Sequence, residues 1–291
     1  MTQIEVFAPA KINLALHVTG QRADGYHLLD TLVAFADVGD GVGVEVGTFE
    51  PQLSVSGPEA TPALATDDNI MWQVARRFAP ADLSVRMHLE KNLPLASGIG
   101  GGSADAAAVY RGLRALSGAA GLDAPPSAED RAHLLAIGAD VPMCALGQPA
   151  RIQGIGEVMT PLTTFPSLGV VLINPRQGVS TPAIFGKLAQ KDNASLSDVP
   201  SGFAGTGHLL DWLAHQRNDL EGPAREVCPA IDAVLAALAA ASECRLARMS
   251  GSGATCFGRF ATREAAFVAA DLLRRAHPDW WVQGGSLYGA G

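Results

Sequence analysis

Apolar and polar positions follow two different periods along this chain, and together they predict a mixture of strands and helices. Residues 83–90 alternate apolar and polar side chains, as in a strand with one buried face. Residues 42–46 alternate in the same way, whereas 169–173 form the continuous apolar run expected of a strand covered on both faces. Helices are expected at 69–78, 103–116, 127–137, 229–242 and 262–276.

These strands and helices are mixed without strict alternation, which favours an α+β fold over a doubly wound parallel sheet. Glycine and proline cluster between residues 147 and 161, and we expect a boundary near residues 150–165. The sequence therefore predicts an N-terminal domain at 1–155 and a C-terminal domain at 156–291. A second loose segment at 191–207 is expected to be a surface loop.

Composition supports a folded enzyme-sized protein and narrows its partners. Of the 291 residues, 48% are hydrophobic and 17% are charged, which is enough apolar material for a large core. The net charge is −8 without a Lys/Arg cluster, so no nucleic-acid partner is expected. An acidic chain must hold an anionic ligand with local donors, because its overall field repels anions.

The cysteines and the N-terminus indicate a cytoplasmic protein without a membrane span. None of the four cysteines lies in a C-x-x-C pair or at zinc spacing from a histidine, so disulfides and structural zinc are not expected. No signal peptide is visible at residues 1–10. The apolar stretch at 231–241 is too short to cross a bilayer.

The most informative segment is a glycine-rich stretch between the strand ending near residue 90 and the helix starting near Ser103. Gly98, Gly100, Gly101 and Gly102 permit positive φ and close approach of the backbone to a ligand. Successive amide groups and the helix start can then bind a phosphate. The alternative is a tight strand-to-helix turn with Ser103 as N-cap. Four glycines within five positions favour phosphate binding.

The chain lacks the residues that define other glycine-rich phosphate-binding motifs. The chain has no G-x-x-x-x-G-K-[ST] loop, and the stretch lacks the third glycine of the dinucleotide fingerprint. It also lacks the H-R-D and D-F-G motifs of protein kinases and the G-x-S-x-G motif of many hydrolases.

Three blocks in order, 8–14, 94–103 and 249–255, resemble the motifs of the galactokinase, homoserine kinase, mevalonate kinase and phosphomevalonate kinase (GHMP) superfamily. This resemblance implies a two-domain α+β kinase with its active site in the cleft between the domains and ATP as co-substrate. We expect Mg²⁺ on the phosphates, near Ser103, although no carboxylate ligand can be identified. The residues that the resemblance assigns to ATP are Pro94, Ser97, Gly98, Gly100, Gly101, Gly102, Ser103, Gly251, Ser252 and Gly253.

Further blocks at 22–27, 138–142, 154–157, 180–185 and 217–220 resemble one family of this superfamily, the 4-diphosphocytidyl-2-C-methyl-D-erythritol kinases. The resemblance implies ATP-dependent phosphorylation of a 2-hydroxyl in the non-mevalonate isoprenoid pathway. Ala104 replaces a frequent serine, which removes one hydroxyl. Two alternatives stay open: another small-molecule kinase of the homoserine or mevalonate type, and a non-catalytic nucleotide-binding regulator.

The resemblance implies that Asp140 is the catalytic base. The position of Asp140 just past a predicted helix places its carboxylate against the negative helix end, which itself suggests a functional reason. Lys11 interrupts an apolar run, and a buried lysine needs a partner. We expect it to pair with Asp140, the alternative being an edge-strand lysine that reaches solvent. Asn13 shares the strand face of Lys11 and is expected to bind the substrate.

The acceptor's cytosine is expected to lie among aromatic side chains. The resemblance implies that Tyr26 and His27 grip the base, that Phe185 stacks on its other face, and that Thr181 belongs to the same substrate site. The alternative for Tyr26 and His27 is that they are loop aromatics over the edge of the core. Asn69 and Lys91 are expected to border the adenine, or else to be solvated. The sequence leaves the oligomeric state open.

Overall fold

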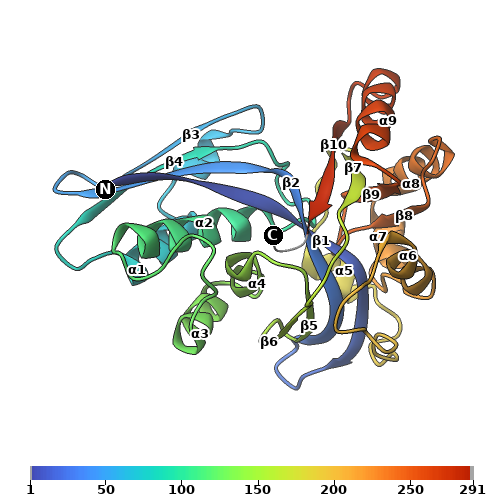
Figure 1. Cartoon of the computed structure of the whole chain (residues 1–291), viewed down its shortest axis with the longest axis horizontal. Helices are drawn as coiled ribbons and strands as arrows, with labels where there is room; N and C mark the ends of the chain where they lie inside the picture. Colours follow the sequence, from blue (N-terminus) through green and yellow to red (C-terminus); the bar gives the residue numbers. More distant parts are fainter. Residues whose placement is uncertain (1, 289–291) are drawn as a thin grey trace. The chain divides into compact units, whose positions relative to one another are not determined.

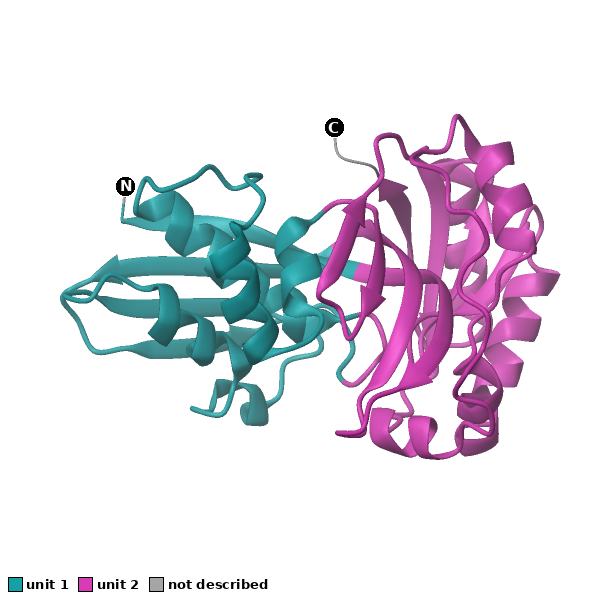
Figure 2. Cartoon of the chain, turned by 90° about the horizontal axis from the view of Figure 1, so that it is seen from below, with its two compact units in different colours: residues 1–10, 39–95, 100–147 teal, residues 11–38, 96–99, 148–291 magenta. Residues whose placement is uncertain are grey.

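The structure, a computed structural model, describes residues 2–288, and the chain divides into two compact units (Figure 2). Unit 1 comprises Met1–Ala10, Gly39–Leu95 and Gly100–Gly147, and unit 2 comprises Lys11–Val38, Ala96–Ile99 and Gln148–Gly291. The two first strands, β1 (Gln3–Gln21) and β2 (His27–Gly47), each contribute to both units.

The units are therefore interleaved along the chain, whereas the sequence-based domains 1–155 and 156–291 are consecutive. That division stays a prediction. The chain passes from unit 1 to unit 2 for the last time at residues 147/148, at the start of the glycine- and proline-rich segment.

Unit 1 contains a sheet built on the second half of β2. This half pairs antiparallel with β4 (Ser84–Glu90), which pairs parallel with β3 (Gln52–Ser56). Along β4, Val85, Met87 and Leu89 are buried and alternate with more exposed residues, as predicted. The helical elements of unit 1 are η1 (Pro62–Ala65), α1 (Ile70–Phe78), α2 (Gly101–Leu116), α3 (Ala128–Ile137) and α4 (Val141–Leu146) (Figure 1).

The starts of these helices follow from their capping residues. Asn69 and Ser127 accept bonds from first-turn amides of α1 and α3, as expected of N-caps. Helix α2 begins two residues earlier than predicted, because Gly100 adopts the left-handed conformation and serves as its N-cap. Ser103 lies inside the first turn, so the interpretation of Ser103 as N-cap was wrong.

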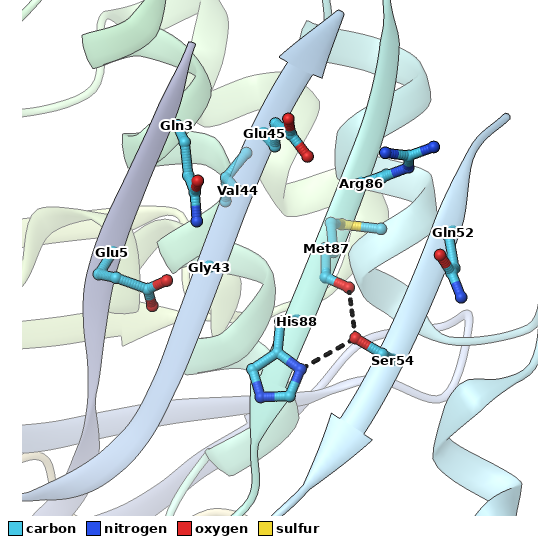
Figure 3. Close-up of a pocket in the computed structure, with 10 residues that line it drawn as sticks. All are labelled: Gln3, Glu5, Gly43, Val44, Glu45, Gln52, Ser54, Arg86, Met87 and His88. Atoms are coloured by element: carbon cyan, nitrogen blue, oxygen red, sulfur yellow. Dashed lines mark hydrogen bonds between the residues drawn. The ribbon is translucent and has the colours of Figure 1, made fainter. Parts of the chain in front are cut away.

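Helix α2 packs closely on one face of the unit 1 sheet. A Cβ on Gly112 would lie 3.1 Å from a methyl of Val44 and 3.3 Å from one of Ile4. The opposite face is polar. Figure 3 shows the residues that line a shallow hollow there, among them the polar side chains of Glu5, Gln52, Ser54, Arg86 and His88; its volume is about 190 Å³. None of the predicted site residues lines this hollow.

In unit 2 the first half of β2 pairs with three other strands. It pairs with β1, and at Leu29–Val33 it pairs antiparallel with β5, which pairs with β6. At Phe35 and Ala36 it pairs antiparallel with β10, and the order continues β10–β7–β9–β8. Every residue of β7 is buried, as its continuous apolar run predicted. The bounds are β5 (Ala150–Gly154), β6 (Val158–Pro161), β7 (Leu168–Asn174), β8 (Leu246–Met249), β9 (Cys256–Phe260) and β10 (Trp281–Tyr288).

Helices cover these strands to enclose the core of unit 2. Helix α9 packs on β10 and β7, and α8 packs on β8 and β9. Both occur where the sequence predicted helices, and α9 is capped by Thr262. Within residues 2–288, no helix has the length and apolar character needed to cross a bilayer. The helices of unit 2 are α5 (Thr181–Gly186), α6 (Thr206–Ala214), α7 (Glu221–Val227), α8 (Ala230–Ala240) and α9 (Arg263–Ala276).

Candidate active site

The first glycine-rich loop, which contains Gly98, packs directly on a second glycine-rich loop at residues 249–255. Gly98 has a φ of +75°, and a Cβ at this position would lie 2.6 Å from Gly253 N and from Ser250 O. Such distances are far shorter than any real Cβ contact, so only glycine fits here without a shift of the backbone. The amide of Thr255 donates to the carbonyl of Ser97 at 3.1 Å and fixes this approach.

Hydrogen bonds from Asn218 hold the second glycine-rich loop in place. The buried side-chain amide of Asn218 donates to the carbonyls of Met249 at 2.8 Å and Gly251 at 2.9 Å. The hydroxyl of Ser250 accepts from the amide of Asn13 at 3.0 Å, which ties the loop to β1. The sequence had marked residues 217–220 only as a family block. No local pattern could show that Asn218 supports a loop thirty residues away.

Lys11 and Asn13 lie at the start of a buried polar chain in unit 2. Lys11 is only 4% exposed, so the solvent-reaching alternative was wrong. Its ammonium donates to Oδ1 of Asn13 at 2.8 Å, which confirms that the two share a strand face. The side-chain amide of Asn13 donates to the hydroxyl of Thr31 at 2.8 Å, and the hydroxyl of Thr31 donates to Ala15 O at 2.6 Å. This chain fixes the position of the lysine head. Thr31 was not identified from the sequence.

Asp140, in unit 1, follows the end of α3 at Ile137, as predicted, and it also serves as the N-cap residue of α4. The electrostatic argument considered only the helix that ends before Asp140 and missed the helix that begins after it. Pro142 lies in the first turn of α4, where proline is favoured, although proline inside a helix would end it. A carboxylate at this end of a helix is favoured by the dipole. The side chain does not cap the first-turn amides of α4.

The predicted cytosine-binding aromatics form a pair in unit 2. The rings of His27 and Phe185 stack at a centroid distance of 4.5 Å and an angle of 22°, while Tyr26 is exposed. Burial lowers the pKa of His27, and the charge of Lys191 adds to this, so the imidazole is neutral at pH 7. The Nε2 atom of His27 is buried without a hydrogen-bond partner among residues 2–288.

Two residues that were predicted to bind different ligands are in contact with each other. The hydroxyl of Thr181, at the start of α5, lies 2.8 Å from that of Ser252 in the second glycine loop. Thr181 was expected at the acceptor and Ser252 at ATP. This contact lies within unit 2, so the substrate segment and the second loop are neighbours there.

The two residues expected near adenine have structural partners in unit 1. Asn69 accepts from Met71 N at 2.9 Å and donates to Leu64 O at 2.8 Å. Lys91 is 1% exposed and pairs with two aspartates, so a solvated lysine is excluded. Gly101, Gly102 and Ser103 belong to this unit at the start of α2, and Pro94 belongs to it in the segment that follows β4. Across residues 2–288, no group of three or more His, Cys, Asp or Glu side chains forms a metal site, and the magnesium ligands stay unassigned.

Comparison with known proteins identifies the family. Residues 69–148 match the GHMP kinases N terminal domain and residues 202–279 match the GHMP kinases C terminal domain. A 4-diphosphocytidyl-2-C-methyl-D-erythritol kinase from Roseobacter denitrificans is 51% identical, with 96% of this chain and 92% of the relative covered. One from Cereibacter sphaeroides is 50% identical, with 98% of this chain and 99% of the relative covered.

Solved structures agree with the sequence relatives. The crystal structure of a 4-(cytidine 5'-diphospho)-2C-methyl-D-erythritol kinase has a TM-score of 0.76 and 32% identity, covering 99% of this chain and 100% of the other. A homoserine kinase from Cytophaga hutchinsonii shares the fold, with a TM-score of 0.67 and 17% identity over 99% of this chain and 95% of the other. The predicted α+β GHMP fold is confirmed. The chain belongs to the 4-diphosphocytidyl-2-C-methyl-D-erythritol kinase family of the GHMP kinases.

Proposed function

We propose that this chain transfers the terminal phosphoryl group of ATP to the 2-hydroxyl of 4-diphosphocytidyl-2-C-methyl-D-erythritol, as a cytoplasmic enzyme of the non-mevalonate isoprenoid pathway. Family membership at 50% identity over almost the whole chain carries the proposal. It is supported by the second glycine loop, which contacts both the first loop and the polar chain of Lys11.

ATP binding rests on the backbone. In a chain of net charge −8, the phosphates need concentrated local donors. The left-handed glycines at 98, 100, 251 and 253 shape two loops of the kind that binds anions through backbone amides, and α2 begins directly after the first. Magnesium, when bound, neutralises charge on the phosphates. Ser103 is partly exposed in the first turn of α2 and is the side chain we assign beside it.

The acceptor chemistry requires a fixed positive charge and a proton acceptor. Lys11 is oriented by Asn13 and Thr31, so its ammonium can stabilise charge that develops on the acceptor oxygen without reorganising first. Asp140 orients the hydroxyl and takes its proton. Phosphoryl transfer passes through a loose transition state, and the proton leaves late, so a carboxylate is a sufficient base.

Cytosine recognition is assigned to His27, Phe185 and Tyr26. A base stacked between two rings needs room for two stacking distances. The centroids of the His27 and Phe185 rings are 4.5 Å apart, which is a single stacking distance. We therefore propose that Phe185 moves with α5 to admit the base. The neutral His27 then gains, at its buried and unpartnered Nε2, the hydrogen bond that the protein itself does not supply.

Replacing Phe185 with alanine is expected to weaken binding of the cytidyl acceptor selectively. A lost base stack costs about 1–3 kcal/mol, which corresponds to a rise in KM of roughly 5- to 150-fold. Steady-state kinetics with each substrate varied in turn measure this. The KM for ATP should change little, and Phe267→Ala on the exposed side of α9 is the matched control. Equal rises for both substrates would contradict the assignment of Phe185.

Identification of the product tests the proposed reaction directly. After incubation with Mg-ATP and the cytidyl acceptor, mass spectrometry should show one added phosphoryl group, and phosphorus NMR should place it on the 2-hydroxyl. A phosphoryl group on another oxygen would refute the proposed regiochemistry, and unchanged acceptor would refute the activity.

A further inference from the structure

Arg248 is a buried arginine whose side chain hydrogen-bonds to backbone carbonyls from separate segments of unit 2. It lies on β8, directly before the second glycine-rich loop, and is 8% exposed. Its Nη1 donates to the carbonyl of Leu14 on β1 at 2.8 Å. Its Nη2 donates to the carbonyls of Leu213 on α6 at 3.1 Å and of Gln216 after α6 at 2.8 Å. One guanidinium therefore joins three segments to β8.

The charge of Arg248 has no carboxylate bonded to it. Among residues 2–288 the side chain makes no ion pair, and Glu221 acts on it only through its charge. Oε2 of Glu221 accepts instead from the amide of Met249 at 3.0 Å. Burial lowers the pKa of Arg248, but arginine stays protonated in proteins. A buried charge needs its donors satisfied, and the planar fork of a guanidinium suits carbonyls that lie in different segments.

Arg248 closes the edge of β1 at the position where pairing of the strand with another backbone segment ends. Alternate residues of a strand direct their backbone groups to the same edge. At this edge the amide of Leu16 donates to Arg217 O at 2.9 Å, and the carbonyl of Leu16 accepts from Asp219 N at 2.9 Å. At Leu14, the next position along the edge, the donor is the guanidinium of Arg248. The side chain thus continues the support that the backbone of 217–219 begins.

Leu14 lies beside the polar chain that orients Lys11. The preceding residue, Asn13, accepts from the ammonium of Lys11 at 2.8 Å, and its backbone amide donates to the hydroxyl of Ser250 at 3.0 Å. Ser250 belongs to the second glycine-rich loop and lies two residues after Arg248. Arg248 therefore holds together the two segments that the bond between Asn13 and Ser250 connects.

The neighbour of Arg248 in the chain is fixed as well. Met249 donates its amide to Glu221, and its carbonyl accepts from the side chain of Asn218 at 2.8 Å. The backbone that carries Arg248 is therefore held in one register against the segment after α6. The guanidinium is oriented before any substrate binds.

We propose that Arg248 is a positioning residue for phosphoryl transfer, which fixes the Leu14 carbonyl of β1 and thereby holds Lys11 in place relative to the second glycine-rich loop. The side chain itself touches neither substrate. The inference rests on the proposed role of Lys11 in transfer. Because Lys11 acts on charge that develops only in the transition state, its displacement lowers kcat and changes the KM of each substrate little.

Arg248→Met removes the three hydrogen bonds and keeps an unbranched side chain. We expect kcat to fall roughly 10- to 100-fold, the size of effect expected when a reacting group is misplaced by about 1 Å, while each KM stays within about threefold of wild type. Steady-state kinetics with each substrate varied in turn measure both constants. A rise in KM without a loss of kcat would overturn the proposal.

Arg259→Met is the matched control. Arg259 lies on β9, the neighbour of β8, and is buried to a similar extent at 5% exposure. Within residues 2–288 its side chain makes no hydrogen bond, so the control removes a buried arginine without removing a tie to β1. Its kcat should stay within about twofold of wild type even where the Tm falls. An equal loss of kcat in both variants contradicts a specific role for Arg248.

A double-mutant cycle with Lys11 separates positioning from a general loss of packing. If Arg248 acts through Lys11, Arg248→Met should lower kcat by about twofold or less in a Lys11→Met background. The full loss in both backgrounds overturns the proposal. Arg248→Lys serves where Arg248→Met does not fold. It keeps the charge, but its single nitrogen cannot reproduce the fork, so kcat should still fall and the same cycle applies. A wild-type kcat for Arg248→Lys would also overturn the proposal.

Hydrogen exchange without substrate separates this inference from the proposed function. In Arg248→Met the amides of residues 13–16 and 249–255 should exchange roughly tenfold faster than in wild type, whereas those of β7 should not change. Arg259→Met should leave residues 13–16 unchanged. This selective exchange in a protein without kinase activity supports the positioning of β1 by Arg248 and rejects only the proposed function. Unchanged exchange at residues 13–16 overturns the inference even where turnover is normal.

Discussion

Asp140→Asn is expected to lower kcat by about 10²–10⁴, the usual contribution of a positioned general base. The amide keeps the size of the carboxylate but does not take the proton of the acceptor hydroxyl. Because the side chain of Asp140 does not cap α4, the substitution removes no capping bond and should leave the helix intact. The loss should therefore appear in turnover rather than in stability.

The measurement is kcat with both substrates saturating, together with the Tm of the variant. Asp123→Asn, an exposed aspartate in the same unit, serves as the matched control and should behave like wild type. A folded Asp140→Asn protein with full activity would remove Asp140 from the mechanism.

Gly98→Ala is expected to disrupt both stability and ATP binding. The left-handed conformation alone costs a residue with a Cβ about 1–2 kcal/mol. The added Cβ would also lie 2.6 Å from the backbone of the second loop, whose atoms cannot swing aside as a side chain does. Asn218 and the Thr255–Ser97 bond hold that backbone in place. A lowered Tm and loss of measurable ATP affinity should result.

Gly102→Ala is the matched control for this effect. A Cβ at this position meets no atom within 4 Å, and alanine favours a helix more than glycine does. The Tm should therefore be unchanged or higher, while the KM for ATP should rise if phosphate lies against this turn. The packing explanation fails if Gly98→Ala retains the wild-type Tm.

Elements whose signals are local could be predicted from the sequence. The alternation of β4, the apolar run of β7 and the helix starts near residues 69, 127 and 262 each depend on a few neighbouring residues. Local signals also misled where one residue type has two roles. Pro142 indicated that no helix continues past Asp140, but it stands in the first turn of α4, so the electrostatic argument for Asp140 took account of only one of its two neighbouring helices.

Contacts between distant segments could not be predicted in this way. Asn13 is 237 residues from Ser250 in the chain, and Lys91 is 51 residues from Asp40. Neither separation leaves a periodic pattern. The resemblance to a family supplied the roles of Lys11 and the glycines. It did not supply their supports Thr31 and Asn218, because these act through hydrogen bonds that appear only after folding.

The most direct test of the proposed activity is a coupled ADP-release assay with the purified protein and Mg-ATP. Three acceptors are compared in parallel: 4-diphosphocytidyl-2-C-methyl-D-erythritol, homoserine and mevalonate. We expect turnover with the cytidyl acceptor alone. Turnover with homoserine or mevalonate instead would keep the fold and the glycine loops but contradict the roles of His27 and Phe185, and no turnover with any acceptor would contradict the assignment of a kinase activity to this chain.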